Sequence, residues 1–407
     1  MAGRPRTRPR LLVLGAGPAQ LGLLEAARAR GDLHVIAADR NPDAIGFGLA
    51  DERAVVSTED EEAIDRLARA RNVAGLVSPG ADWPVGVAAR VAARLGLPHP
   101  IDPPTAAAAT SKLRQREAFA AADVPHARAF AVDAAELPFP CVVKVPDRQG
   151  QRGLALVRER ADLEPALTVA SRESRSGELL VEEHVDGPEL TVNAFSVNGT
   201  FVPLMVTDRL TAGEPAFGVA LAHVWPSAHD TDEVVAVAHA AVEALGIRHG
   251  PSYTQLRLGP RGPVVMEVAA RLGGGHDAEL CRAATGVDLN GLAIDAALGT
   301  VPDGGLSPAS LTGDRPVRGQ SPGAAVVFLV PPAGRLLEVE GVEEAEAVDG
   351  VEWVRVYRRP GHVLGPFRRG ADRAGAVLAL GADREEALER GRRAAGAVRF
   401  RVDADAP

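Results

Sequence analysis

Residues 139–153 read FPCVVKVPDRQGQRG, an apolar run that ends in Lys144 and is followed by a polar loop containing Gly150 and Gly153. An apolar run bounded in this way is typical of a buried strand. Lys144 and Lys112 are the only lysines among the chain's 45 basic residues. Lysine carries a compact charge on a slim stem, whereas arginine presents a broad planar fork. These two positions are therefore predicted to contact phosphate oxygens; the alternative is chance survival of two lysines in an arginine-rich chain.

The composition limits the class of protein. The chain has 407 residues, 46% of them hydrophobic, which is enough for about two to four packed domains. Its net charge of −9 argues against binding nucleic acid through phosphate contacts. Cys141 and Cys281, the two cysteines, form no metal-ligand pattern and no disulfide framework, which fits a reducing cytoplasm. No apolar run reaches the roughly 18 residues of a membrane span, and residues 1–10 lack a signal-peptide core. We expect a cytoplasmic protein with no nucleic-acid or membrane partner.

Strand and helix signals alternate through the first hundred residues, which predicts a parallel sheet flanked by helices. The middle of the chain mixes strands and helices, with one helix predicted from Pro103 to Ala122. The predicted fold is therefore α/β followed by α+β. The predicted domains are 1–105, a βαβ domain; 106–300, an α+β domain with a mobile lid at about 120–180; 301–323, a linker or mobile loop; and 324–407, a C-terminal α+β unit.

A glycine turn follows the first predicted strand. Its sequence is Gly15-Ala16-Gly17, and Asp39 ends the second strand. This order is similar to a dinucleotide-binding turn, in which glycines let a pyrophosphate approach the backbone. The third glycine should stand at position 20, which is Gln20. A tight turn without a nucleotide is the simpler interpretation.

An acidic segment between two predicted strands is the second candidate site. Glu182 and Glu189 lie seven residues apart around a turn. One carboxylate could approach the adenine amino group while the other accepts from the ribose hydroxyls, and the peptide groups between them could bind the adenine edge. Taken alone, the segment is ordinary, and a solvated acidic turn is the simpler interpretation.

A predicted hairpin supplies the third candidate. Gln255 on one strand and Glu267 on the next could face each other, and their oxygen atoms suit Mg²⁺ bound jointly with phosphates. Arg271 follows, with Gly274 in a glycine-rich turn. A guanidinium beside bare backbone amides suits a carboxylate or another oxyanion. A surface hairpin with a flexible turn would show the same pattern.

Together these segments resemble the ATP-grasp superfamily, in particular its carboxylate–amine (amino acid) ligase branch, over about residues 11–299. The order of the motifs carries the resemblance, because each motif is weak alone. The matching segments are, in chain order, Gly15–Gly22, Thr110-Ser111-Lys112, Val143-Lys144, the loop Gln149–Gly153, the positions Glu182, Glu183, Val185 and Glu189, and Met266–Gly274.

The resemblance implies an ATP-grasp fold with an N-terminal pre-ATP-grasp domain, and ATP with Mg²⁺ or Mn²⁺ as cofactors. It implies a ligase in which ATP phosphorylates a carboxylate and an amine attacks the acyl phosphate, releasing ADP and phosphate. We expect small-molecule carboxylate and amine substrates and a homodimer. The implied site residues are, for ATP, Lys112, Lys144, Gln149, Gly150, Gly153, Glu182, Glu183, Val185 and Glu189; for the metal, Gln255 and Glu267; for catalysis, Lys144 and Arg271; and for substrate, Arg271, Gly274 and His223.

Two positions depart from the family's pattern. Gln255 stands where an acidic metal ligand is usual, and Ala269 stands where Asn is frequent. These departures keep a catalytically silent ATP-binding subunit open as a second interpretation. An ATP-grasp enzyme that phosphorylates formate or bicarbonate in purine or biotin-type chemistry is a third. An oxidoreductase that uses the Gly15–Gly17 turn is a fourth.

Overall fold

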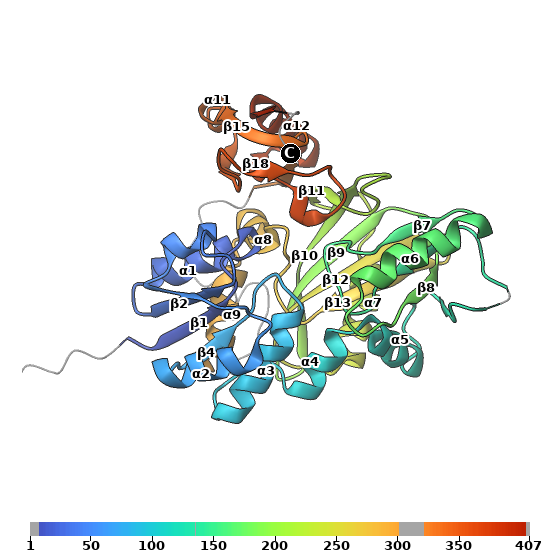
Figure 1. Ribbon diagram of the computed structural model, residues 1–407, viewed down its shortest axis with the longest axis horizontal. Coiled ribbons are helices and arrows are strands. Elements are labelled where there is room, and N and C mark those ends of the chain that lie inside the picture. Colours follow the sequence, from blue (N-terminus) through green and yellow to red (C-terminus); the bar gives the residue numbers. More distant parts are fainter. Residues whose placement is uncertain (1–7, 135, 301–320, 404–407) are drawn as a thin grey trace, which may run out of the picture.

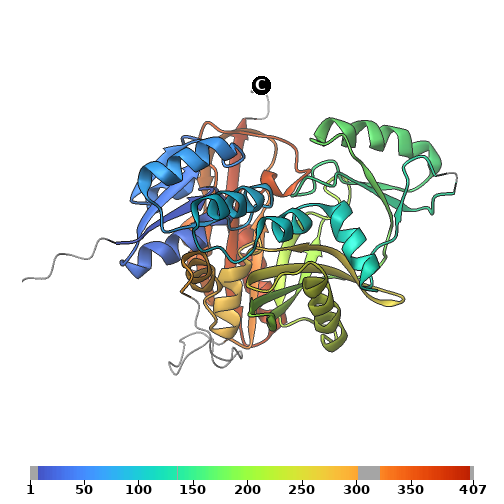
Figure 2. The same cartoon turned by 90° about the horizontal axis from the view of Figure 1, so that it is seen from below.

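The computed structural model describes residues 8–134, 136–300 and 321–403. In Figure 1 the N-terminal part and a small lobe lie at opposite ends of the molecule, with a long antiparallel sheet between them. Figure 2 shows the same separation from below. Within the described ranges no helix is both long and apolar enough to cross a bilayer.

The N-terminal part is the predicted parallel sheet. Its strands are ordered β3-β2-β1-β4, and every pairing is parallel. Helices cover both faces, which explains why β1 and β4 are almost entirely apolar. The elements are β1 (Arg10–Leu14), β2 (His34–Asp39), β3 (Glu52–Val55), β4 (Gly75–Val77), α1 (Leu21–Arg30), α2 (Glu61–Arg71), α3 (Trp83–Leu95) and the 3₁₀ turns Pro18–Gln20 and Ile45–Leu49.

The single helix predicted from Pro103 to Ala122 is wrong. The chain forms α4 (Pro103–Ala109) and α5 (Lys112–Ala121), separated at Ser111. Ser111 has an extended backbone, and its side-chain oxygen accepts from the Arg114 N–H at 3.5 Å. A serine hydroxyl competes for backbone amides and favours a helix start over a helix interior. Lys112 is consequently the first residue of a helix.

The small lobe follows α5 and contains the strand that ends in Lys144. Its sheet has the order β5-β8-β6-β7, with antiparallel pairings and α6 packed on it. Alternate residues of β6, Cys141 and Val143, are buried in the lobe's core with Val157 and Leu163. The elements are β5 (Ala129–Phe130), β6 (Cys141–Lys144), β7 (Ala155–Val157), β8 (Leu180–Glu183), α6 (Leu163–Glu173) and the 3₁₀ turn Arg160–Asp162.

The central sheet runs through most of the molecule, in the order β13-β12-β9-β10-β11-β14-β18-β16. Its first five strands come from the middle of the chain and its last three from the C-terminal part, where β14 pairs with β11. The sheet therefore crosses the boundary predicted near residue 324. The strands are β9 (Glu189–Val197), β10 (Thr200–Thr211), β11 (Ala220–Trp225), β12 (Gly250–Gly259), β13 (Gly262–Ala269), β14 (Gly323–Leu329), β16 (Val351–Val356) and β18 (Gly375–Gly381).

The C-terminal part is α+β, as predicted, and a second small sheet with the order β17-β15-β19 accompanies the strands that join the central sheet. The predicted linker lies outside the described residues over 301–320. The remaining elements are α7 (Asp232–Ala244), α8 (Asp277–Thr285), α9 (Leu289–Leu298), β15 (Gly334–Glu340), α11 (Val342–Glu346), β17 (Val363–Leu364), the 3₁₀ turn Gly370–Asp372, α12 (Arg384–Ala397) and β19 (Arg399–Asp403).

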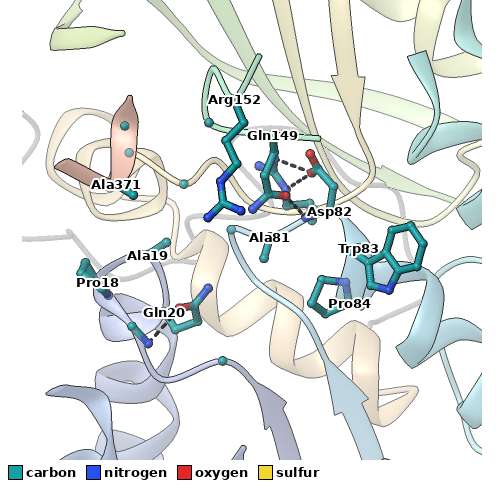
Figure 3. Close-up of a pocket in the computed structure, with 18 of the residues that line it drawn as sticks. Pro18, Ala19, Gln20, Ala81, Asp82, Trp83, Pro84, Gln149, Arg152 and Ala371 are labelled. Atoms are coloured by element: carbon teal, nitrogen blue, oxygen red, sulfur yellow. Dashed lines mark hydrogen bonds and ion pairs between the residues drawn. The ribbon is translucent and has the colours of Figure 1, made fainter. Parts of the chain in front are cut away.

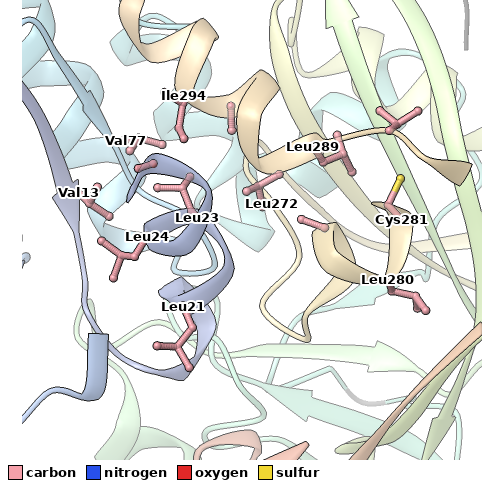
Figure 4. Packing of buried hydrophobic residues seen from close by; sticks show 14 of the residues in the cluster. Val13, Leu21, Leu23, Leu24, Val77, Leu272, Leu280, Cys281, Leu289 and Ile294 are labelled. Carbon is pink, nitrogen blue, oxygen red and sulfur yellow. The ribbon is translucent and has the colours of Figure 1, made fainter. Parts of the chain in front are cut away.

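One hydrophobic core joins the N-terminal sheet to the rest of the protein. Figure 4 shows Leu23 and Leu24 of α1 on one side and Leu272 and Ile294 on the other, all in one buried cluster. Burial of such side chains contributes roughly 1.5–3 kcal/mol each. The N-terminal sheet is thus fixed against the turn that follows β13.

The absence of a side chain at Gly75 allows β4 and α9 to pack closely at this junction. A Cβ at Gly75 would lie 2.2 Å from the Ala297 carbonyl oxygen of α9. We expect Gly75→Ala to lower the free energy of unfolding by about 1–3 kcal/mol, because packed backbones must separate. Gly48→Ala is the matched control, since a Cβ there meets no atom within 4 Å. Urea titrations followed by tryptophan fluorescence would measure both; equal midpoints would contradict this packing.

Candidate active site

A cleft between the small lobe and the central sheet gathers most of the predicted ATP-binding and metal residues. Strands β6 and β8 form one wall, β12 and β13 form the other, and the 147–153 loop closes one side. The predicted residues that line it are Lys112, Lys144, Gln149, Gly150, Glu183, Val185, Glu189, Gln255 and Glu267. Segments that lie far apart in the chain therefore converge here, as the motif order required.

Lys144 is held by a buried cluster of charges. Its ammonium pairs with Glu182 on the adjacent strand, and Arg116 Nε of α5 lies 2.5 Å from the other carboxylate oxygen. Arg116 also donates to the Met266 carbonyl at 2.7 Å. Burial alone would raise the pKa of Glu182, but Arg116 and Lys144 outweigh it and lower that pKa to about 2. Glu182 is fully buried behind the cleft, so its contact with adenosine stays a prediction.

Lys112 and the hairpin meet on the opposite wall. Gln255 and Glu267 are directly paired across β12 and β13, as predicted. Lys112 Nζ lies 2.9 Å from Glu267 Oε1 and donates to the Arg148 carbonyl at 2.8 Å. Burial would raise the pKa of Glu267, but the charges of Lys112 and Arg271 lower it below the usual value. Glu267 is therefore a carboxylate anion facing the cleft.

A divalent ion at this hairpin would need ligands from its substrate. The described residues contain no group of three His, Cys, Asp or Glu side chains that could hold a metal. One carboxylate and one amide oxygen fit a magnesium ion only when phosphate oxygens complete the coordination. Gln255 and Glu267 suit that shared arrangement.

The other acidic positions of the cleft are paired with arginines. Glu189 contacts Arg209 at 2.5 Å and Arg257 at 3.3 Å. Glu183 lies 2.8 Å from Arg128 and 2.9 Å from Arg261. Paired in this way, these carboxylates have fixed positions, which suits directed hydrogen bonds to a ligand.

The loop 149–153 is held by contacts with both the N-terminal and the C-terminal parts of the chain. The Asp82 N–H, at the start of α3, donates to the Gln149 side chain, and the Gly370 N–H donates to the Gly150 carbonyl at 3.3 Å. Figure 3 shows Gln149 and Asp82 facing each other, with Ala19 and Gln20 of the N-terminal turn nearby. Gly153 does not line the cleft.

Gly153 is fixed by packing. It has φ +66°, and a Cβ there would lie 2.5 Å from Val145 Cγ2. A side chain at this position would be strained by the backbone and would clash with the lobe's core. Gly153 therefore closes the base of the loop, and its contact with ATP stays a prediction.

A second cavity of about 520 Å³ adjoins the cleft and shares Lys112, Gln149, Gly150 and Gln255 with it. The N-terminal turn, the start of α3, the turn after β13 and the C-terminal strands enclose it. All three predicted substrate residues line it; they are Arg271, Gly274 and His223. This cavity extends away from the cleft at Lys112 and Gln255, which line both.

The groups that face this cavity are oriented by their neighbours. Arg271 Nε donates to Asp82 Oδ1 at 2.7 Å, and its NH1 donates to the Leu272 carbonyl at 2.8 Å. His223 Nδ1 lies 2.9 Å from Asp277 Oδ1, while Asp277 Oδ2 accepts from the Gly275 N–H at 3.0 Å. Burial raises the pKa of Asp277, but His223 and its other partners lower it below the usual value.

Sequence reasoning missed several residues of the larger cavity. Asp82, Phe328, His276, Tyr357 and Arg373 all line it. His276 lies just beyond the Met266–Gly274 motif, Asp82 lies outside every motif, and the other three belong to the C-terminal part, which carried no motif. The fold alone brings them to the cavity.

The dinucleotide interpretation of the N-terminal turn loses its support. Asp39 Oδ2 accepts from the Ala16 N–H at 2.9 Å, and Oδ1 accepts from the Asn41 N–H at 2.9 Å. One oxygen of the carboxylate thus holds the turn, and the other holds the segment that follows β2. Gln20, in place of the third glycine, accepts from the Gly17 N–H at 3.0 Å and donates to the Pro79 carbonyl at 2.7 Å. These bonds fix the wall of the cavity.

Comparison with known proteins gives a consistent picture. An ATP-grasp domain model matches residues 137–279, and a model of the L-amino acid ligase C-terminal domain 2 matches residues 327–403. An uncharacterised protein of Sinorhizobium fredii is 30% identical over 390 residues, covering 89% of this chain and 77% of the relative. A formate-dependent phosphoribosylglycinamide formyltransferase of Burkholderia vietnamiensis is 28% identical over 427 residues, covering 96% and 95%.

Among solved structures, an L-amino acid ligase from Bacillus licheniformis superimposes with a TM-score of 0.80 at 22% identity, covering 98% of this chain and 100% of that one. This likeness shows the ATP-grasp fold. The chain belongs to the ATP-grasp family, whose enzymes use ATP with Mg²⁺. It is an ATP-grasp ligase whose residues 327–403 form a C-terminal domain of the L-amino acid ligase type.

The Glu182 cluster should give the protein a defined acid sensitivity. Because the pKa of Glu182 falls from 4.5 to about 2 on folding, its stabilising effect is complete above about pH 4.5 and disappears as pH falls toward about 2. Glu182→Gln should lower the free energy of unfolding at pH 7 by about 3–5 kcal/mol, since Lys144 and Arg116 stay buried without an anion.

Urea titrations between neutral and acidic pH would measure this effect, and parent and variant should converge as pH falls. Glu338→Gln is the control. Glu338 and its partner Arg401, 3.4 Å away, are both exposed, and an exposed ion pair contributes about 0–1 kcal/mol to stability. A constant gap between parent and Glu182→Gln at all pH values would contradict the prediction.

Proposed function

We propose that this protein is an ATP-dependent carboxylate–amine ligase that forms an amide or peptide bond through an acyl phosphate. The observation that carries the proposal is the junction of the two cavities. The cleft with both lysines and the hairpin opens there into a cavity of about 520 Å³ that contains Arg271 and the amides around Gly274. A phosphoryl donor and a carboxylate acceptor can therefore meet at one point.

ATP would lie in the cleft, with its adenosine near Glu183, Val185 and Glu189 and its phosphates between Lys112 and Lys144. Phosphoryl transfer needs little covalent help from a protein, so positioning and charge neutralisation account for most of the catalysis. The two lysines enter from opposite walls and would neutralise charge from both sides. Mg²⁺ bound by Glu267, Gln255 and the phosphates would supply further neutralising charge.

The carboxylate substrate would be bound by Arg271. In this structure the Arg271 guanidinium is paired with Asp82, whose Oδ1 accepts from Nε at 2.7 Å. A substrate carboxylate would replace Asp82, with one oxygen on the Nε and NH2 side of the guanidinium, where Asp82 Oδ1 lies now, and the other held by the backbone around Gly274. Its oxygen then attacks the γ-phosphate, a P–O bond to ADP breaks, and an acyl phosphate forms.

The amine would enter from the 520 Å³ cavity and attack the acyl carbon. The C–N bond forms and the C–O bond to phosphate breaks, so phosphate leaves with the electron pair. The loop 149–153, anchored at Asp82 and Gly370, covers this point and would limit access of water to the acyl phosphate.

Formate activation is the second candidate function. The similarity to the Burkholderia formyltransferase over 96% of this chain favours it. The match of residues 327–403 to the L-amino acid ligase C-terminal domain supports the amide ligase instead, because that domain forms the far wall of the substrate cavity.

An assay for ADP and phosphate would separate these functions. The purified chain is incubated with ATP, Mg²⁺ and either pooled amino acids, formate or bicarbonate, with hydroxylamine added in parallel to capture an acyl phosphate as a hydroxamate. Amino-acid-dependent ADP release with a new amide mass supports the proposal. Release with formate or bicarbonate alone supports the second candidate, and no release under any condition would indicate a silent ATP-binding subunit.

Lys144→Arg should abolish most turnover although it keeps the charge. The wider guanidinium must share a buried carboxylate that Arg116 already contacts, so it cannot reach the phosphates in the same way. We expect kcat to fall on the order of 10²-fold. ADP release by the parent and the variant is compared at saturating ATP, with thermal unfolding as the check on folding. Turnover near that of the parent would remove the argument from the lysines.

Gln255 should set the magnesium requirement. Gln255→Glu adds a negative charge with nearly the same shape and should lower the Mg²⁺ concentration for half-maximal turnover; each tenfold shift corresponds to about 1.4 kcal/mol. Glu267→Gln removes the hairpin's paired carboxylate and should abolish turnover. Mg²⁺ titrations of ADP release measure both variants. An unchanged midpoint in the first, together with activity in the second, would place the metal elsewhere.

A further inference from the structure

A buried hydrogen-bonded chain reaches the substrate cavity from the side of the C-terminal domain. The Tyr357 hydroxyl contacts His276 Nε2, and His276 Nδ1 lies 2.8 Å from Glu279 Oε1. Tyr357 and His276 both line the 520 Å³ cavity. His276 stands two residues after Gly274, in the turn that leads into α8. The chain thus begins beside the proposed acyl-phosphate position.

The charges around His276 favour one arrangement of protons. Glu279 is paired with Arg355, whose NH1 donates to Oε1 at 2.6 Å, and this cation favours the carboxylate form. Glu279 Oε1 is the shorter contact of His276 Nδ1, at 2.8 Å against 3.0 Å for Arg355 NH1, and a carboxylate can only accept. The Nδ1 hydrogen is therefore assigned to Glu279, and Nε2 is left to accept from the Tyr357 hydroxyl. Arg355 lies 3.0 Å from Nδ1, 2.6 Å from Glu279 and 2.5 Å from Glu25 of α1, and Trp353 packs against the ring edge-on.

The proposed reaction has a step that needs a proton acceptor. Aliphatic amines are mostly protonated near neutral pH, and an ammonium group has no lone pair for attack on an acyl carbon. The other basic groups near the site already have carboxylate partners: Lys112 is paired with Glu267, Lys144 with Glu182, Arg271 with Asp82 and His223 with Asp277. The phenol oxygen of Tyr357 keeps acceptor capacity on the cavity side while its hydrogen is directed at His276.

We propose that Tyr357, His276 and Glu279 form a proton relay that deprotonates the amine substrate, an inference that rests on the proposed ligase function. The ammonium N–H gives its proton to the Tyr357 oxygen as the Tyr357 hydrogen moves to His276 Nε2. The imidazolium that results is stabilised by Glu279. The neutral amine then attacks the acyl carbon, the C–O bond to phosphate breaks, and the departing phosphate takes the second proton from nitrogen.

Tyr357→Phe and His276→Asn test the relay by removing its first and second members. Phenylalanine keeps the ring and deletes only the hydroxyl. Asparagine suits position 276, where φ is +62°, because it tolerates the left-handed region better than most residues. Tyr253→Phe is the matched control, since Tyr253 also lines the cavity and its hydroxyl is no part of the His276 chain.

The decisive measurement compares two nucleophiles on the same acid. Hydroxylamine is a weak base and is neutral at pH 7, so its capture of the acyl phosphate needs no relay. With the amine found in the pooled assay, both relay variants should lose amide formation on the order of 10²-fold and keep hydroxamate formation within about threefold of the parent. The amide deficit should shrink between about pH 7 and about pH 9, as more amine becomes neutral. Tyr253→Phe should change the rates of amide and hydroxamate formation by the same factor.

The outcomes separate the relay from the proposed function. If the relay variants lose amide and hydroxamate equally, or if their deficit does not depend on pH, the chain is structural and the relay is overturned. If the parent forms neither product with any acid, the ligase function fails and the relay with it. A selective, pH-dependent loss in both variants establishes the relay.

Discussion

The buried carboxylate of Glu182 is the constraint on which the site depends. A charge removed from water must be paired, and Glu182 obtains its partners from β6 and α5, which the sequence places on either side of the small lobe's first strand. Arg116 extends the same cluster to β13 through the Met266 carbonyl. The small lobe, the helix that begins at Lys112 and the hairpin are therefore fixed relative to one another by one group. The proposed positions of both phosphate lysines follow from that fixed geometry.

The cavities combine parts of the molecule that have little in common as sequence. The N-terminal sheet contributes a turn held by Asp39 and Gln20, the middle of the chain contributes the hairpin and Arg271, and the C-terminal domain contributes Tyr357 and Arg373. The loop at Gln149 and Gly150 contacts both of the outer parts. The larger cavity is thus lined by all of these parts, which gives the C-terminal domain a direct part in the proposed chemistry.

The sequence predicted the fold and most of the cleft because its signals were local or had a strict order. The scarcity of lysine isolated Lys112 and Lys144, and the hairpin pattern correctly paired Gln255 with Glu267. The single helix across Ser111 was wrong, since apolar periodicity continued through a residue whose side chain caps the start of a new helix. The burial of Glu182 could not be predicted, because its two cations come from separate segments. Tyr357 and Arg373 had no motif around them and become visible only when the central sheet brings the C-terminal strands to the cavity.

The pairing of β14 with β11 has a consequence for any attempt to divide this protein. A chain that ended near residue 300 would leave β11 as a sheet edge, with unpaired N–H and C=O groups along Ala222, His223, Val224 and Trp225. Its residues Ala222 and Val224 are apolar and buried, so the exposed strand would be a template for self-association with other chains. The match to the ATP-grasp domain model ends at residue 279, yet the folding unit extends through the last strands of the C-terminal domain.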